Sequence, residues 1–451
     1  MTYADICSYP EQSFHRYWKQ IINDPHFREL LKGFFIQQQA IERAKAFGKA
    51  AMDIPFEAGS KIGAKIGAKG FAAYHATLLK LKSFRSWSDF QNFMVYLVQQ
   101  VLDRTTQGFS FGGLDYITKE MKQRGICFLS SHRSTFLDPA LANYTLFKTF
   151  GKTAHNAAGD NIFKTTWLGH LIRLNKGFMV KREVEDMDEK LLEAQKLSGY
   201  IKDITEKQKW VWIAHRNGRA KDGKDLTDSA VLSMLKMAHE DRNWEEFSQE
   251  TAYMPIAMSW EHIPLDDLMA QELNGITLHS GTHRDMMNII TEIRITKRRI
   301  HLQFCEPAHG VKRTELVKSL DHQIHSNTKL WESNWVAYLE LLRAQDPQQA
   351  QKIHNQVSTQ VDLSQGQWLL DRAAEQGTIV AQGIEDGTFH CPQNFCEDQD
   401  LVHKSSQWKA NQMGHRVSQS LLAMYAAPVE LALKAQSEDV IQVLQTQAQL
   451  G

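Results

Sequence analysis

The sequence predicts an α/β fold, in which helices cover both faces of a central, mostly parallel sheet and helical regions flank it on either side. Two observations support this prediction. Between about residues 109 and 308, short apolar runs alternate with longer helical patterns. Before and after that stretch, apolar residues recur every three or four positions. Strands that alternate with helices favour a parallel sheet, because each crossover helix packs back onto it.

The N-terminal region, residues 1–106, is predicted to be helical. Segments 27–40 and 90–101 carry apolar residues at spacings of three and four, as one buried helix face requires. Ser86 and Ser88 precede the second segment and are suitable residues for a helix start.

A basic segment lies between those two helices. Lys61, Lys65 and Lys69 recur every four residues, with Ile62 and Ile66 beside them. Such a pattern suits the anionic surface of a phospholipid membrane. The alternative is a surface helix packed on the central domain, and the glycines of the segment weaken any helix there.

The central domain, residues 107–310, contains four predicted strands. Each is a short apolar run between polar or turn residues, at 126–129, 210–213, 254–257 and 300–304. Residues 311–451 form a helical C-terminal region with a loop-like stretch at 383–399. A chain of 451 residues is long enough for two or three domains.

Composition limits the class of protein. Hydrophobic residues make up 42% and charged residues 23%, which is typical of a globular chain. The 52 basic and 52 acidic residues cancel, so we expect local basic patches and no nucleic-acid partner. Five scattered cysteines favour a reducing, cytoplasmic compartment. We expect no signal peptide and no transmembrane helix, so any lipid substrate would be met at the inner face of the cell membrane.

The candidate catalytic pair is His132 and Asp138. The Asp138–Pro139 step before good helix formers predicts Asp138 at the N-cap and Pro139 at the first helical position. His132 then lies in a loop at the carboxyl end of a strand, where open α/β sheets bind ligands. A bent loop would bring the carboxylate to one imidazole nitrogen, which leaves the other as a general base. The alternative is that Asp138 only caps the helix.

Basic residues follow two further apolar runs. Lys181 and Arg182 offer a point charge and a planar fork, both suited to phosphate oxygens. Arg219 and Lys221 follow the strand at 210–213, beside Gly218, which permits close backbone approach to an anion. Arg133 adds a positive charge next to His132. The alternative for each group is a solvated surface loop.

These segments resemble, in order, the sequence blocks of the glycerolipid acyltransferase superfamily, which includes glycerol-3-phosphate and lysophosphatidate acyltransferases. The first block is His132 to Asp138, the second ends in Lys181-Arg182, the third runs from His215 to Lys224, and the fourth from Tyr253 to Glu261. Two departures mark a divergent branch. Five residues separate His132 from Asp138, a His-x5-Asp motif where the family has four, and Arg216 replaces a glutamate of the third block.

The resemblance implies an acyltransferase of phospholipid biosynthesis. It would move a fatty acyl group from acyl-CoA or acyl carrier protein to the hydroxyl of a glycerol-phosphate or lysophospholipid-type acceptor. His132 and Asp138 would be catalytic, and the substrate-binding residues would be Arg133, Lys181, Arg182, Gly218, Arg219 and Lys221. We expect no cofactor and no metal in this reaction.

Two other functions fit the same residues. The longer spacer and the replaced glutamate are compatible with a non-catalytic lipid- or partner-binding protein on this fold. A hydrolase of acyl thioesters is the second possibility. His390, Cys391, Cys396 and His403 have a spacing at the outer limit for structural zinc and lack a second cysteine pair, so we do not expect a metal site there.

Overall fold

The computed structural model describes residues 3–29, 31–32, 67–182, 184–278, 284–390, 392, 395 and 404–450. The chain divides into two compact units. Unit 1 consists of Met1–Tyr96 and His155–Glu185, and unit 2 of Leu97–Ala154 and Asp186–Gly451. The basic segment with Lys61, Lys65 and Lys69 and the cysteine pair Cys391 and Cys396 lie outside the described residues and side chains.

Unit 2 contains five strands of the mostly parallel sheet, in the order β1-β8-β6-β2-β5. β2 pairs in parallel with β5 and β6, β1 pairs in parallel with β8, and β6 and β8 are antiparallel. The strands are β1 (Thr106–Gly112), β2 (Ile126–Ser130), β5 (Trp210–Ala214), β6 (Ala252–Trp260) and β8 (Arg298–Phe304). The predicted fold class is therefore confirmed.

The four predicted strands correspond to β2, β5, β6 and β8. Every residue of β2 and of the nine-residue β6 is buried, which explains why their sequences read as continuous apolar runs. β1 was not predicted. It is rich in glycine and polar residues and is largely exposed along its length, so it lacks the apolar run that marked the others.

Helices surround these strands. α9 packs against β5, and α11 and α14 pack against β6. The helices of this part of unit 2 are α6 (Lys119–Lys122), α7 (Leu137–Phe150), α9 (Met187–Glu206), α10 (Ser229–Lys236), α11 (Trp244–Glu250), α12 (Asp266–Leu273) and α13 (Arg284–Arg294). α5 (Trp87–Thr105) begins in unit 1 and ends in unit 2.

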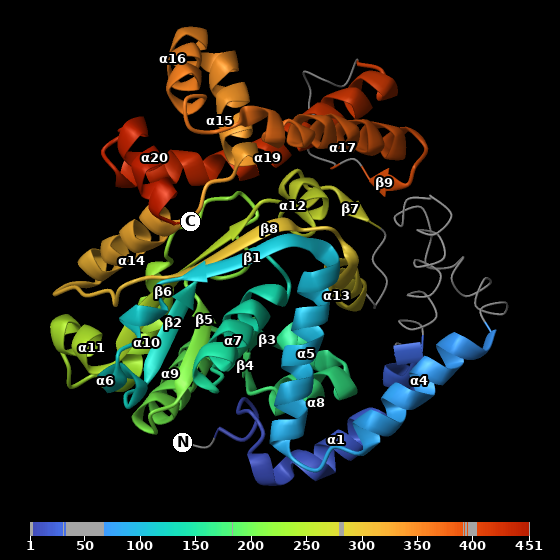
Figure 1. Cartoon of the computed structure of the whole chain (residues 1–451), viewed down its shortest axis with the longest axis vertical. Coiled ribbons are helices and arrows are strands. Elements are labelled where there is room, and N and C mark those ends of the chain that lie inside the picture. The colour runs from blue at the N-terminus through green and yellow to red at the C-terminus, as the bar shows by residue number, and fades with distance from the viewer. Residues whose placement is uncertain are drawn as a thin grey trace. The chain divides into compact units, whose positions relative to one another are not determined.

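The C-terminal helices belong to unit 2 as well. α17 lies along α19, and α15 packs against both α16 and α19 (Figure 1). Their bounds are α14 (Arg313–Asn327), α15 (Glu332–Gln345), α16 (Pro347–Val357), α17 (Trp368–Glu385), α19 (Ser406–Ala435) and α20 (Val440–Gln449). A small antiparallel pair joins β7 (Thr277–Leu278) to β9 (Phe389–His390). The sequence-based division at residues 106 and 310 follows changes in the apolar pattern along the chain, whereas the compact units have other bounds.

Unit 1 combines N-terminal helices with a short parallel strand pair. An aromatic cluster that includes Phe14, Trp18 and Phe90 forms its core. Its elements are α1 (Phe14–Asn23), α4 (Gly67–Lys82), β3 (His155–Gly159), α8 (Thr166–Leu174) and β4 (Gly177–Val180). Across the described parts of both units, no helix is long and apolar enough to cross a membrane.

Candidate active site

His132 lies in the loop that joins β2 to α7. Ser130, the last residue of β2, is in register with Ala214, the last residue of β5, so the loops after both strands leave the same edge of the sheet. The backbone N–H of Ala220, in the second loop, donates to the carbonyl of His132 at 2.8 Å. The two loops that the sequence singled out therefore meet at His132.

The pairing predicted between His132 and Asp138 is confirmed. Nδ1 of His132 lies 3.0 Å from Oδ2 of Asp138, and the Asp138 side chain is fully buried while 13% of the His132 side chain is exposed. An ionised carboxylate can only accept, so Nδ1 carries the proton and Nε2 keeps a lone pair. Geometrically, His132 is a general base oriented by a carboxylate; its role in catalysis stays a prediction.

Three more donors hold the Asp138 carboxylate. The backbone N–H groups of Arg133 and Ser134 donate to Oδ2 at 2.7 and 2.8 Å. The indole Nε1 of Trp260, at the end of β6, donates to Oδ1 at 3.1 Å. The sequence placed Trp260 in the fourth block but gave no reason to pair it with Asp138, because 122 residues separate the two.

The helix starts two residues earlier than the prediction. α7 begins at Leu137, with Phe136 at the N-cap, so Asp138 lies within the first turn and is not the N-cap. Ser134 explains the difference, since its Oγ accepts the backbone N–H of Asp138 at 2.8 Å. The carboxylate of Asp138 can then turn back to the loop and to His132.

Arg133 does not lie where the sequence placed it. Its side chain is buried, and Nε and Nη2 donate to Oδ2 of Asp225 at 3.0 and 2.6 Å. Nη2 also donates to the carbonyl of Gly223 at 3.1 Å. Burial alone would raise the pKa of Asp225, but Arg133 and His215 hold it well below its usual range. Arg133 therefore ties the His132 loop to the second loop, and Asp225 and Gly223 already occupy its guanidinium.

The second loop, residues 215–224, carries the basic residues of the third block. Gly218 and Gly223 adopt left-handed φ angles of 75° and 73°, which bend the loop back towards His132. Arg219 and Lys221 both face Glu272 of α12, with Lys221 Nζ 2.7 Å and Arg219 Nη2 3.8 Å from Oε2. Arg216, which replaces the family's glutamate, pairs instead with Asp222 at 3.3 Å.

Glu272 was missed at the level of sequence. It is 20% exposed and comes from a helix about 50 residues further along the chain, in no recognisable motif. Nη1 of Arg219 is buried and has no hydrogen-bond partner within the described ranges. The Arg219–Lys221 pair thus keeps donor capacity beyond its contact with Glu272.

Lys181 and Arg182 follow β4 in unit 1. Nζ of Lys181 lies 3.5 Å from Oδ2 of Asp5. Burial lowers the pKa of Arg182, and the nearby charge of Asp160 partly offsets that effect. Both residues belong to the other compact unit, so their part in the site stays a prediction.

Comparison with known proteins gives one family match, and it lies within the central domain. Residues 109–258 match the family model described as Acyltransferase. The central domain, which contains this match, is called the acyltransferase domain below. Among solved structures, the chain is similar to the 1-acyl-sn-glycerophosphate (LPA) acyltransferase PlsC from Thermotoga maritima, with 15% identity over 66% of this chain and 94% of that chain and a TM-score of 0.32. A search of curated proteins found no match.

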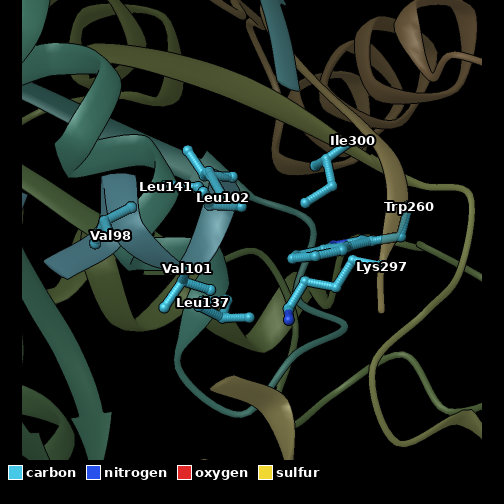
Figure 2. Close-up of a pocket in the computed structure, with 8 residues that line it drawn as sticks. All are labelled: Val98, Val101, Leu102, Leu137, Leu141, Trp260, Lys297 and Ile300. Carbon is cyan, nitrogen blue, oxygen red and sulfur yellow. The ribbon is translucent and has the colours of Figure 1, made fainter. Parts of the chain in front are cut away.

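A small apolar recess in the acyltransferase domain lies beside Asp138. Leu137 directly precedes Asp138, and Trp260 donates to it, and both side chains line the recess (Figure 2). The rest of the lining is aliphatic apart from one amine, and comes from α5, α7, the residue before β8, and β8: Val98, Val101, Leu102, Leu141, Lys297 and Ile300.

Two buried titratable groups of the domain flank the same region. Lys297 is 1% exposed, and burial lowers the pKa of its amine to about 7 although Glu292 opposes that shift. Its Nζ donates to Thr105 Oγ1 at 3.0 Å and to the carbonyl of Ile295 at 2.7 Å. Glu292, on α13, is fully buried, and burial raises the pKa of its carboxyl to about 7. Neither residue belongs to a sequence motif.

The histidines, cysteines and carboxylates of the described residues are not clustered as metal ligands would be. The described residues contain no group of three or more His, Cys, Asp or Glu side chains placed to hold a metal ion. Cys7, Cys127 and Cys305 are free thiols, and burial raises the pKa of Cys127 and of Cys305 to about 12.

Proposed function

We propose that this protein transfers a fatty acyl group from an acyl thioester to the hydroxyl of a glycerol-phosphate or lysophospholipid-type acceptor, as a step of phospholipid biosynthesis. The observation that carries the proposal is the 3.0 Å hydrogen bond between His132 and Asp138 in an acyltransferase domain. Acyl-CoA or acyl carrier protein would supply the acyl group.

His132 would act as the general base. Nε2 takes the proton of the acceptor hydroxyl while the hydroxyl oxygen attacks the thioester carbonyl. The buried Asp138 stabilises the imidazolium that forms, because its carboxylate already accepts from Nδ1. When the tetrahedral intermediate collapses, the C–S bond breaks and the proton on Nε2 passes to the departing sulfur. The step needs no covalent enzyme intermediate.

Arg219 and Lys221 would bind the phosphate of the acceptor. The hydrogen bond from Ala220 to His132 supports this role, because it keeps the basic loop beside the base. The buried Nη1 of Arg219 offers a donor to an anion, and the bend at Gly218 leaves the backbone accessible. Lys181 and Arg182 would supply further positive charge. Arg133 is left out of this set, since Asp225 and Gly223 already occupy its guanidinium.

We further propose that the protein works at the cytoplasmic surface of a phospholipid membrane, where lysophospholipid acceptors are found.

A panel of acceptors with one labelled acyl donor tests this function. Glycerol-3-phosphate, lysophosphatidate and lysophospholipids are each offered with acyl-CoA or acyl carrier protein, and the labelled lipid is counted. We expect product that depends on the acceptor. Release of free fatty acid at the same rate with and without acceptor would support a thioester hydrolase instead.

Changing His132 to Ala should abolish acyl transfer and leave the thermal midpoint nearly unchanged. The remaining donors to Asp138 still satisfy its buried carboxylate, so the fold keeps its hydrogen bonds. His415→Ala, at an exposed position of α19, is the matched control and should keep full activity. Full activity in the His132 variant would show that His132 is not the general base.

A further inference from the structure

The loop between His132 and Asp138 is longer by one residue than the related motif, and a second carboxylate meets it. Glu292 Oε1 accepts the backbone N–H of Thr135, and Oε2 accepts that of Phe136 at 3.3 Å. The Glu292 side chain comes from α13, more than 150 residues away in sequence.

Together, two carboxylates bind four consecutive backbone N–H groups. Asp138 accepts those of Arg133 and Ser134, and Glu292 accepts those of Thr135 and Phe136. Residues 133–137 make up the whole spacer, and α7 begins at the last of them. Four of the five N–H groups of the spacer are therefore bound by two buried carboxyl groups, which set the path of the loop.

The burial of Glu292 argues for a specific role. An uncharged side chain of similar size would avoid the cost of placing a carboxylate among apolar groups. Charged groups face Glu292 from three elements. Asp138 of α7 raises the pKa of Glu292 and Arg219 of the basic loop lowers it, while Glu292 raises the pKa of Lys297, which precedes β8. Glu292 therefore interacts both with the loop between His132 and Asp138 and with Arg219 of the basic loop.

We propose that Glu292 is a positioning residue for the acyl transfer proposed above, because it holds the extra length of the His132–Asp138 loop by accepting the N–H groups of Thr135 and Phe136. Without it, the spacer is free to bulge and His132 is no longer held in the geometry of a base. This inference rests on the proposed function for its kinetic part, and on the loop geometry for the rest.

Two variants, Glu292→Gln and Glu292→Ala, test the proposal. The amide keeps one acceptor oxygen and the alanine keeps none, so kcat should fall by about tenfold and about a hundredfold, respectively. KM for donor and acceptor should stay within about twofold, because Glu292 touches neither substrate. Asp346→Asn is the matched control: Asp346 also accepts two consecutive N–H groups at a helix start, those of Gln348 and Gln349, and its loss should leave kcat unchanged.

The pH profile separates positioning from general stability. With a pKa of about 7, Glu292 becomes ionised as the pH rises through neutrality, which strengthens its hold on the two N–H groups. The kcat of the wild type should therefore carry an ionisation near pH 7 that the Gln variant lacks. An identical profile in both proteins would overturn the proposal.

Hydrogen–deuterium exchange measures how well the loop amides are protected, independently of acyl transfer. The amides of residues 133–136 should be protected in the wild type and in Asp346→Asn, and those of Thr135 and Phe136 should exchange faster in both Glu292 variants. Unchanged protection, or faster exchange with unchanged kcat, would overturn the inference. A wild type without acyl transfer would overturn the proposed function, and the exchange rates would still decide whether Glu292 holds the loop.

Discussion

The carboxylate of Asp138 accepts four hydrogen bonds while fully buried. A buried carboxyl group is stable only when its oxygens are paired, so these donors satisfy both oxygens and also fix the plane of the group. That plane decides the direction of the His132 ring. At the scale of one residue, the candidate mechanism depends on donors that never touch a substrate.

Trp260→Phe removes the indole donor to Oδ1 of Asp138 and keeps an aromatic ring in the core. A hydrogen bond to a charged group contributes about 1.5–3 kcal/mol, so we expect kcat to fall by roughly tenfold or more. Steady-state kinetics with saturating donor and acceptor measure this effect.

Trp210→Phe is the control for that variant. Nε1 of Trp210 is buried and has no hydrogen-bond partner in the part of the chain that the structure describes. Its replacement removes the same N–H without breaking a bond. Equal losses of kcat in the two variants would show that Trp260 acts only through packing.

Glu272→Gln should tighten binding of a phosphorylated acceptor. Glu272 neutralises part of the charge of Arg219 and Lys221, and a phosphate must compete with it for both. We expect the acceptor KM to fall by about threefold to tenfold at low ionic strength, and the difference to shrink in salt because the groups are partly exposed. Initial rates over a range of acceptor and salt concentrations check this.

Glu340→Gln removes a carboxylate of the same charge from an exposed ion pair with Arg343 on α15. It should leave the acceptor KM unchanged. An unchanged KM in the Glu272 variant as well would place the acceptor phosphate away from Arg219 and Lys221.

At the scale of elements, the sequence predicted what local patterning determines. The buried strands β2, β5, β6 and β8 have apolar runs of their own, and parallel pairing then brings the loops after β2 and β5 to one edge. His132 and Asp138 are close in sequence, so the sequence could also predict their pairing. β1 lacked such a run and was missed.

Contacts between distant elements were beyond the sequence. Arg133 looked like a substrate ligand because its position beside His132 was visible, whereas its partner Asp225 lies 92 residues away. Trp260, Glu272 and Glu292 reach the site from three separate elements. Trp260 lies in the fourth block, but nothing in that block pairs it with Asp138, and Glu272 and Glu292 lie in no motif. Periodicity reports burial, and it carries no information on which buried polar groups meet.

The basic loop is also supported by an element of the C-terminal region. A Cβ at Gly223 would lie 2.1 Å from the carbonyl oxygen of Met424 in α19, and Gly223 has a φ of 73°. Gly223→Ala should therefore lower the thermal midpoint and raise the acceptor KM. Gly151→Ala has a similar φ of 65° with open space around it, so it should cost only about 1–2 kcal/mol and leave KM unchanged. Thermal unfolding and initial rates then separate the effect of backbone strain, present in both variants, from the effect of the clash with Met424, present only in Gly223→Ala.

At the scale of unit 2, the C-terminal helices are joined to the acyltransferase domain by a buried charge. Asp266, the first residue of α12, accepts a bidentate hydrogen bond from Arg372 of α17. Tyr425 of α19 donates to the same carboxylate at 2.7 Å and accepts the backbone N–H of Ile263 at 2.9 Å. Because α12 also presents Glu272 to the basic loop, the helical region supports the candidate site and is not a separate appendage.

Arg372→Met should destabilise the whole unit, since it leaves Asp266 buried without its main partner; breaking such a pair costs about 3–5 kcal/mol. Burial raises the pKa of Asp266, but His262 and Arg372 lower it below its unfolded value, so the pairing contributes stability above about pH 4 and loses it as the pH falls through the lower pKa. The difference in free energy of unfolding between wild type and variant should thus be largest at pH 7 and shrink below about pH 4, as denaturant titrations at pH 7 and at about pH 2 can measure. Arg343→Met, which breaks only the exposed pair with Glu340, should change that free energy by less than about 1 kcal/mol at either pH. If the two variants are equally stable at pH 7, the C-terminal helices are not held to the domain through Asp266.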